Sequence, residues 1–266
     1  MVSRNHPATN SQMPSVFTAT TFPTDKLNFG KHKPNPNGGF NIELSIGPSN
    51  SDEILLQTPK MRCPFGISTD KTNPFKKSLD ISFQGIEAND NIKAFRKIVE
   101  SIDNLAIDYA HKNSKAFFKQ EYSREVISAY YSSNIKLSKK EQYSDTFRSK
   151  LLYIKPDEAK KRDAKYLTIF WEIGSKPIER DETYLDKGDS VSILVKPQML
   201  WIGNKQFGVQ WICTQVQVTK NIRATAYAFK KTDESDDEDH VAEAVEAAMG
   251  DTISDSGSEE EVEVDA

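Results

Sequence analysis

The stretch from Asp189 to Lys220 constrains the fold more than any other part of this 266-residue chain. It reads as two long strands joined at Gly203-Asn204-Lys205, because glycine and asparagine accept positive φ at low cost. Apolar residues alternate from Val191 to Val195, ahead of a predicted interruption at Lys196-Pro197. The second strand alternates throughout, and its predicted faces are Val209, Trp211, Cys213, Gln215 and Gln217 against Gln210, Ile212, Thr214, Val216 and Val218. Such a hairpin predicts a small barrel or curved sheet with one face open to a flat ligand.

Shorter alternating runs predict further strands around this hairpin. They are Phe40–Ile46, Glu53–Thr58, Leu79–Phe83, Thr146–Ile154, Tyr166–Ile173 and, as an edge strand, Ile222–Phe229.

One helical excursion separates two groups of these strands. Asn89 to Lys119 repeats apolar residues at spacings of three and four, which predicts one long helix packed on the sheet. Asn89 and Asp90 are both suitable N-caps, and Ser123–Tyr131 predicts a second, short helix. We therefore expect a mainly β protein, an OB-fold five-stranded barrel with a helical insertion at about residues 89–131.

Charge divides the chain into a basic body and an acidic tail. Residues 232–266 hold 15 Asp and Glu and no Lys or Arg, which leaves 24 acids against 35 bases in residues 1–231, a net charge of +11. The body favours a polyanionic partner and the tail a cationic surface. The predicted organisation is a flexible N-terminal segment over residues 1–35, a body over 36–231 and a disordered acidic tail over 232–266.

Several classes of protein are not indicated. Cys63 and Cys213 have no partner histidines at zinc-ligand spacing, so we expect no metal and a reducing, intracellular setting. No apolar run is long enough for a membrane span, and we expect no membrane partner. No glycine-rich phosphate loop or cofactor motif is present, so we expect no cofactor. No enzyme is expected either, because no nucleophile lies near any of the four histidines, His6, His32, His111 and His240.

Cations interleaved with aromatic residues favour nucleic-acid binding, since single strands need cations for phosphates and flat faces for bases. The alternative is the hydrophobic core for Trp201 and Trp211, and a solvated surface for each cation. Lys76 and Lys77 are further candidate cations. The predicted nucleic-acid-binding residues are Lys60, Arg62, Phe65, Arg148, Lys150, Tyr153, Trp171, Lys196, Trp201, Lys205, Phe207 and Trp211.

Three stretches carry a resemblance to a known family. They are Gln57–Gly66 (QTPKMRCPFG), the helical insertion Asn89–Tyr131, and Phe207–Trp211 running into Gln215–Val218. They resemble the single-stranded DNA-binding protein of nucleocytoplasmic large DNA viruses, which is related to the replicative single-stranded DNA-binding protein of podophages. The resemblance covers about residues 40–230, and the acidic tail by character only.

The resemblance implies an OB fold and sequence-nonspecific binding of single-stranded DNA during viral DNA replication, recombination or repair in an infected cell. It also implies a tail that contacts replication proteins, and it allows a homodimer. The phage relatives end in an aromatic residue, whereas this chain ends in Glu263–Ala266, so we do not expect recruitment through an aromatic terminus. The alternatives are a structural or packaging protein of a large DNA virus, and a histone-chaperone-like protein that holds basic clients with its tail.

Overall fold

The structure, a computed structural model, describes residues 14–35, 38–47, 54–154, 156, 161, 163 and 165–221. These residues belong to a unit that spans Met1–Ile222, and a second unit, Arg223–Ala266, lies outside the described residues. The predicted edge strand over 222–229 and the acidic tail therefore also lie outside them.

The described part of the chain is mainly β with three α-helices, as predicted. The helices are α1 (Asp90–Lys112), α2 (Ser114–Phe118) and α3 (Arg124–Tyr130), with short 3-10 turns η1 (Thr24–Lys26), η2 (Ile86–Ala88) and η4 (Glu182–Tyr184). No described helix has the length and apolar character that crossing a membrane requires.

The strands are β1 (Ser15–Thr18), β2 (Leu27–Pro34), β3 (Phe40–Ile46), β4 (Ile54–Gln57), β5 (Met61–Arg62), β6 (Ile67–Thr69), β7 (Lys77–Ser82), β8 (Ile135–Lys136), β9 (Thr146–Leu151), β10 (Tyr153–Ile154), β11 (Lys165–Tyr166), β12 (Ile169–Glu172), β13 (Ile178–Arg180), β14 (Ser190–Ile202) and β15 (Phe207–Thr219).

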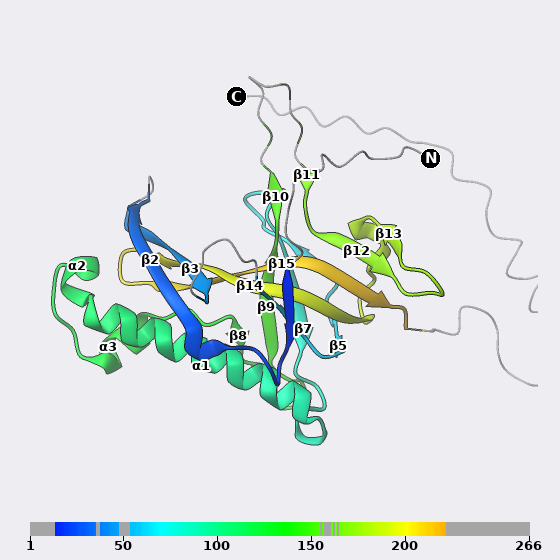
Figure 1. Cartoon of the computed structure of the whole chain (residues 1–266), viewed down its shortest axis with the longest axis horizontal. Coiled ribbons are helices and arrows are strands. Elements are labelled where there is room, and N and C mark those ends of the chain that lie inside the picture. Colours follow the sequence, from blue (N-terminus) through cyan, green and yellow to red (C-terminus); the bar gives the residue numbers. More distant parts are fainter. Residues whose placement is uncertain are drawn as a thin grey trace, which may run out of the picture. The chain divides into compact units, whose positions relative to one another are not determined.

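The long hairpin of β14 and β15 lies at the centre of the sheet (Figure 1). Hydrogen-bonded pairs run from β14 to β5, β7, β9 and β15 and return to β14, so five strands form a closed circuit. Within this circuit only β9 and β15 are parallel. The circuit agrees with the predicted OB architecture, a partly open five-stranded barrel. Further strands extend the same sheet on both flanks, with β1, β2, β3 and β4 on one and β12 and β13 on the other.

A β-bulge in β15 decides which of its side chains face the core. The partner of β14 jumps from Gln215 to Cys213, so Thr214 is the extra residue. Cys213 and Trp211 are buried, whereas Gln215 and Gln217 remain on the outer face. The sequence prediction placed Gln215 and Gln217 on the face of Trp211. That prediction was wrong, because one inserted residue moves every following side chain to the other face.

The predicted interruption at Lys196-Pro197 was also wrong, since β14 continues through it to Ile202. The register shifts between Pro197 and Met199, and a proline, which has no N–H, is tolerated in a sheet at such an irregularity. At the hairpin tip the positive φ belongs to Lys205 (φ 53°) rather than to the glycine and asparagine before it.

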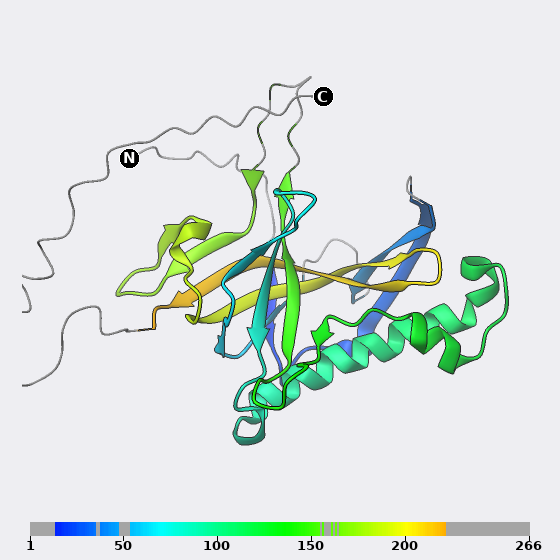
Figure 2. The same cartoon turned by 180° about the vertical axis from the view of Figure 1, so that it is seen from behind.

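The helical insertion lies where the sequence predicted it. Asn89 is the N-cap of α1, and its side-chain oxygen accepts hydrogen bonds from the backbone N–H groups of Asn91 (3.0 Å) and Ile92 (3.2 Å). The helix ends at Lys112, earlier than predicted, and α2 and α3 follow. Figures 1 and 2 show α1 along one side of the β14–β15 hairpin, with β10 and β11 extending away from it.

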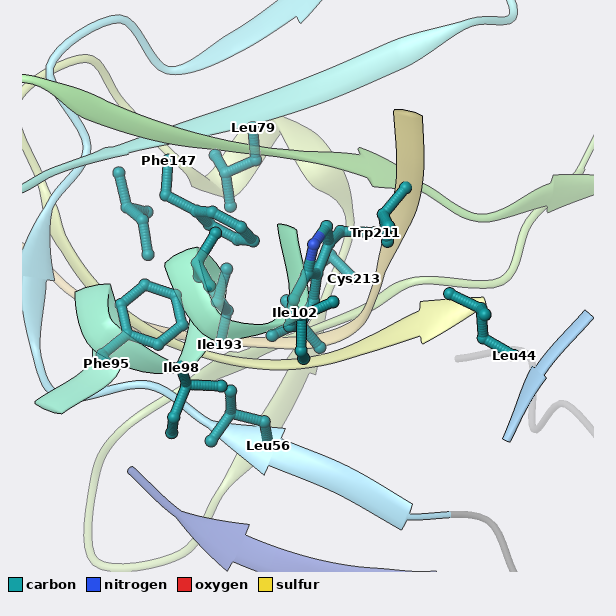
Figure 3. Packing of buried hydrophobic residues seen from close by; sticks show 14 of the residues in the cluster. Leu44, Leu56, Leu79, Phe95, Ile98, Ile102, Phe147, Ile193, Trp211 and Cys213 are labelled. Carbon is teal, nitrogen blue, oxygen red and sulfur yellow. The ribbon is translucent and has the colours of Figure 1, made fainter. Parts of the chain in front are cut away.

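The buried core lies between α1 and the closed circuit of strands (Figure 3). Phe147 of β9 makes edge contacts with Phe95 of α1 at 5.0 Å and with Trp211 of β15 at 5.3 Å between ring centroids. Trp211 is fully buried, with 0% of its surface exposed. This aromatic row therefore joins the helix to the strands.

The N-terminal segment contributes more to the fold than its composition indicates. Pairing of β1 with β4 and of β2 with β3 places much of residues 14–35 in the sheet, contrary to the predicted flexible segment 1–35. Phe29 stacks on Tyr109 of α1 at 4.1 Å, and the His32 Nε2 and Tyr109 hydroxyl lie 2.8 Å apart. The polar composition concealed these contacts because every second side chain of an edge strand faces solvent. Residues 1–13 lie outside the described residues.

We expect Trp211→Ala to lower the free energy of unfolding by about 3–5 kcal/mol, because it leaves a cavity beside Phe147. Trp211→Phe should cost less, since the smaller ring fills part of the cavity and removes an indole N–H that has no partner among the described residues. Urea unfolding of both variants measures this. Ile178→Ala on the exposed edge strand β13 is the control, and an equal loss from Trp211→Ala and Ile178→Ala would contradict a core role for Trp211.

Candidate nucleic-acid interface

A hollow of about 610 Å³, which we call the central groove, lies on the outer face of the sheet. It is bordered by β6, β7, β9 and the β14–β15 hairpin, and by the segment between α3 and β8. Its aromatic side chains are Tyr153 and Trp201, and its other lining residues include the hydroxyl and amide groups of Ser78, Asn134 and Gln198. Among the described residues, the charged side chains that line it are five cations and one acid, namely Lys76, Lys77, Lys136, Arg148, Lys150 and Asp70.

Arg148 is held in place by Asp80, which lies on the neighbouring strand β7. Its Nε and Nη2 atoms each donate to one carboxylate oxygen of Asp80 at 2.7 Å, and Asp80 is only 1% exposed. These hydrogen bonds raise the pKa of Arg148 further. A bidentate pair fixes the plane of the guanidinium, so Asp80 orients Arg148 while cancelling part of its charge.

Lys150 and Lys136 each lie near another positively charged side chain. Lys150 Nζ donates to Gln210 Oε1 at 2.8 Å, and Gln210 Nε2 donates to Gln198 Oε1 at 3.2 Å. Lys150 is exposed overall, but partial desolvation of its ammonium group by the groove lowers its pKa, and the charge of Lys76 lowers it further. Burial and the charge of Arg148 lower the pKa of Lys136 in the same way. An anion in the groove would relieve this repulsion, so the site favours a phosphate.

The indole of Trp201 packs against the backbone of a glycine, Gly208. It lies opposite Gly208 across the hairpin, and a Cβ atom at Gly208 would lie 3.3 Å from the indole and 2.7 Å from the carbonyl oxygen of Ser132. Because no side chain stands at position 208, the indole can lie against the backbone while it also lines the groove. Trp201 is half-buried, so part of its surface remains available to a ligand.

The second aromatic group lies on β10 and β11. Tyr153 faces Tyr166 with ring centroids 6.1 Å apart, and Lys77 Nζ lies 4.4 Å from the centroid of Tyr166. The Tyr166 hydroxyl donates to the carbonyl oxygen of Phe75 at 3.2 Å. These contacts hold Tyr153 beside the lysines of β7 and β9.

A buried carboxylate of α1 supports one wall of the groove. Tyr131 Oη donates to Asp103 Oδ1 and Ser133 Oγ donates to Asp103 Oδ2, each at 2.6 Å. Residues 132–136 that follow Tyr131 include four groove residues. Burial raises the pKa of Asp103 to about 6, against the lowering effect of the two hydrogen bonds. Asp103 thus links the helical insertion to the groove.

The structure brings four of the predicted nucleic-acid-binding residues together, because Arg148, Lys150, Tyr153 and Trp201 all line the central groove. Lys76 and Lys77, the two further candidate cations, line it as well.

The other predicted residues are dispersed. Lys60, Arg62 and Phe65 (58% exposed) are on the surface but do not line the groove. Lys205 is exposed in the hairpin turn, Lys196 is half-buried in β14, and Trp171 lines a separate hollow.

Phe207 and Trp211 were predicted to stack on bases, and the structure places both in the core with 0% exposure. The prediction failed because both stand on the inward face of β15, where Phe118 of α2 packs on Phe207 and Phe147 of β9 packs on Trp211. Asp80 and Asp103 were not among the residues predicted from the sequence. An acid within the apolar run of β7 and another within the apolar stripe of α1 were the available signals, since a buried carboxylate needs partners.

The groove suits binding of a polyanion rather than a metal ion. In the part of the chain that the structure describes, no group of three or more His, Cys, Asp or Glu could hold a metal. The cations can contact phosphates, and the two aromatic faces can stack on flat rings.

No protein-family model matches the chain, and no curated protein matches its sequence. The fold is similar to solved structures of phage proteins. Gp2.5, a single-stranded DNA-binding protein encoded by bacteriophage T7, is 13% identical over 67% of this chain and 98% of its own, with a TM-score of 0.37. The single-stranded DNA-binding protein of bacteriophage Enc34 in complex with single-stranded DNA is 14% identical over 74% of this chain and 98% of its own, with a TM-score of 0.36. A C-terminal truncation of the Enc34 protein is 13% identical over 75% of this chain and 98% of its own, with a TM-score of 0.38.

We expect Asp103 to make stability fall as pH rises from about 4 to about 6. The raised pKa means that ionisation costs more in the folded protein than in the unfolded chain, whose Asp titrates near 3.9. The stabilisation present below that pH is therefore lost as pH rises through about 6, by an amount on the order of 3 kcal/mol. Asp103→Asn should remove this component, as measured by urea unfolding across the same pH range.

The matched control is Asp108→Asn on the same helix, where the carboxylate pairs with Arg124 at the surface. It should change stability by about 1 kcal/mol or less and keep the wild-type dependence between pH 4 and 6. Parallel pH profiles for wild type and Asp103→Asn would show that Asp103 does not titrate in this range.

Proposed function

We propose that this protein binds single-stranded DNA through the central groove without preference for base sequence. The observation that supports this is the presence in one groove of five cations and two aromatic side chains, Tyr153 and Trp201. Cations neutralise the phosphates, and aromatic faces stack on any base because every base has a flat π-face. The aromatic and cationic side chains come from neighbouring strands, so one nucleic-acid strand can contact both kinds at once.

Preference for a single strand over a duplex follows from the same arrangement. Trp201 lies against Gly208 and Tyr153 lies against Tyr166, so each ring has one side supported by the protein. Only unstacked bases can reach such faces, since the faces of bases in a duplex are covered by their neighbours. We therefore propose that duplex DNA binds more weakly, through phosphate contacts alone.

The biological setting is a proposal based on the resemblance of the sequence. It assigns the protein to DNA replication, recombination or repair of a large DNA virus in an infected cell, with replication proteins as partners of the acidic tail. A homodimer is compatible with this assignment, and the protein needs no catalytic activity for it.

We expect Lys150→Gln to weaken binding of single-stranded DNA and to reduce its dependence on salt. Each phosphate contact to a single strand contributes about 0.7 to the slope of the logarithm of affinity against the logarithm of salt concentration. The magnitude of this negative slope should therefore decrease by about 0.7, as measured by fluorescence titration at several salt concentrations.

Lys97→Gln is the matched control, because Lys97 is exposed on α1 and does not line the groove. It changes the net charge by the same amount and should leave the slope unchanged. Equal changes in slope for the two variants would mean that the net charge of the body, and not the groove, controls binding.

We expect deletion of Thr232–Ala266 to strengthen binding of single-stranded DNA, most of all at low salt. The 15 carboxylates of this segment can imitate a nucleic-acid backbone and compete for the cations of the body, whose net charge is +11. Salt screens this competition, so the difference should shrink as salt is added. Paired titrations of full-length and truncated protein at two salt concentrations measure the effect.

Replacing the acids of this segment by Asn and Gln keeps its length and serves as the control. If the negative charge of the segment weakens DNA binding, this variant should bind single-stranded DNA as strongly as the truncated protein does. Identical curves for full-length and truncated protein at low salt would leave the tail without a role in the groove.

A further inference from the structure

A second hollow, of about 330 Å³, lies on the same outer face of the β14–β15 hairpin. We call it the Trp171 pocket. Its lining includes Gln57, Trp171, Ile173, Leu194, Gln215 and Gln217. Trp171 was predicted to bind nucleic acid, yet it lies outside the central groove, together with three glutamines.

The outer face of β14 connects the pocket to the central groove. Leu194, Lys196 and Gln198 are half-buried and follow one another on this strand. Leu194 lines the Trp171 pocket, Gln198 lines the central groove, and Lys196 stands between them opposite Ile212, another groove residue. Figure 1 shows the corresponding order of strands, with β9 nearer the hairpin tip and β12 nearer its open end. A bound DNA strand that leaves the groove along the hairpin therefore passes Lys196 and reaches Trp171.

The chemistry of the pocket suits a nucleobase. Trp171 Nε1 donates to Gln215 Oε1 at 3.0 Å, which fixes the orientation of the indole. Gln57 and Gln217 add amides that can both donate and accept hydrogen bonds, as the edge of a base does. Glu172 is the charged residue of the lining, and Arg180 Nε donates to it at 2.8 Å. The described lining thus offers a flat face and amides but no cation for a phosphate.

We propose that the Trp171 pocket binds a base of the same DNA strand whose phosphates lie in the central groove. The proposal rests on the proposed function. Trp201 lies opposite Gly208 and Trp171 pairs with Gln217, so the two indoles are separated by nine residues of β15, roughly 30 Å of strand. A strand that reaches both indoles must be several nucleotides long, whereas a short oligonucleotide fills the central groove alone.

The test compares Trp171→Ala and Trp201→Ala on two lengths of oligothymidine, about 4 and about 16 nucleotides, the limits of site sizes for this architecture. Trp171→Ala should weaken binding of the long oligonucleotide by about 5- to 150-fold and leave the short one unchanged. Trp201→Ala should weaken both. Trp171→Phe keeps a flat ring and should restore most of the affinity for the long oligonucleotide.

A second measurement does not depend on the folding of the alanine variant. In Trp201→Phe the remaining indoles are Trp171 and the buried Trp211. The long oligonucleotide should quench the accessible fraction of the fluorescence, and the short one should not. In Trp171→Phe the accessible indole is Trp201, so oligonucleotides of both lengths should quench the fluorescence.

Two outcomes overturn the inference in distinguishable ways. If Trp171→Ala binds the long oligonucleotide as wild type does, while Trp201→Ala weakens both lengths, the pocket receives no base and the proposed function stands. If the wild-type protein binds neither length, the proposed function fails and this inference fails with it.

Discussion

The antiparallel pairing of β14 with β15 is the interaction on which the rest of the structure depends. Each strand is thirteen residues long, so the hairpin has room to pair with β3, β4 and β5 along one edge and with β9 and β12 along the other. Its inner face carries the aromatic core that packs on α1. Its outer face carries both the central groove and the Trp171 pocket, so the core and the candidate binding surface are two sides of the same hairpin.

Buried carboxylates organise the groove, although its ligand is expected to be an anion. Asp80 is almost fully buried and is tolerated because Arg148 donates two hydrogen bonds to it. Asp103 accepts two hydroxyl hydrogen bonds that attach the segment after α3 to the helix. Neither acid lines the groove. Each one positions groups that do, so the charges of these two acids lie behind the surface of the groove, and Asp70 is the acid among its described lining residues.

Local signals in the sequence were sufficient for many of the elements. The cap at Asn89, the apolar stripe of α1 and the alternation of β3 and β7 act over a few residues, and the structure confirms each of them. The strands of residues 14–35 were missed because their stability comes from contacts with distant partners, such as Phe29 on Tyr109. No window of a few residues contains both members of such a pair.

The sequence by itself determined that the chain forms a mainly β fold around one long hairpin with a helical insertion, since hydrophobic periodicity and capping are local properties. It also indicated a basic body with interleaved aromatic residues. Only the tertiary structure decided which of those residues share a surface. The bulge at Thr214 turns Trp211 inward and Gln215 outward, and the closed circuit of strands brings Lys150 and Trp201 to one groove. The physical reason is that the face of a side chain depends on register and on what covers it, and both are set by partners far away in the chain.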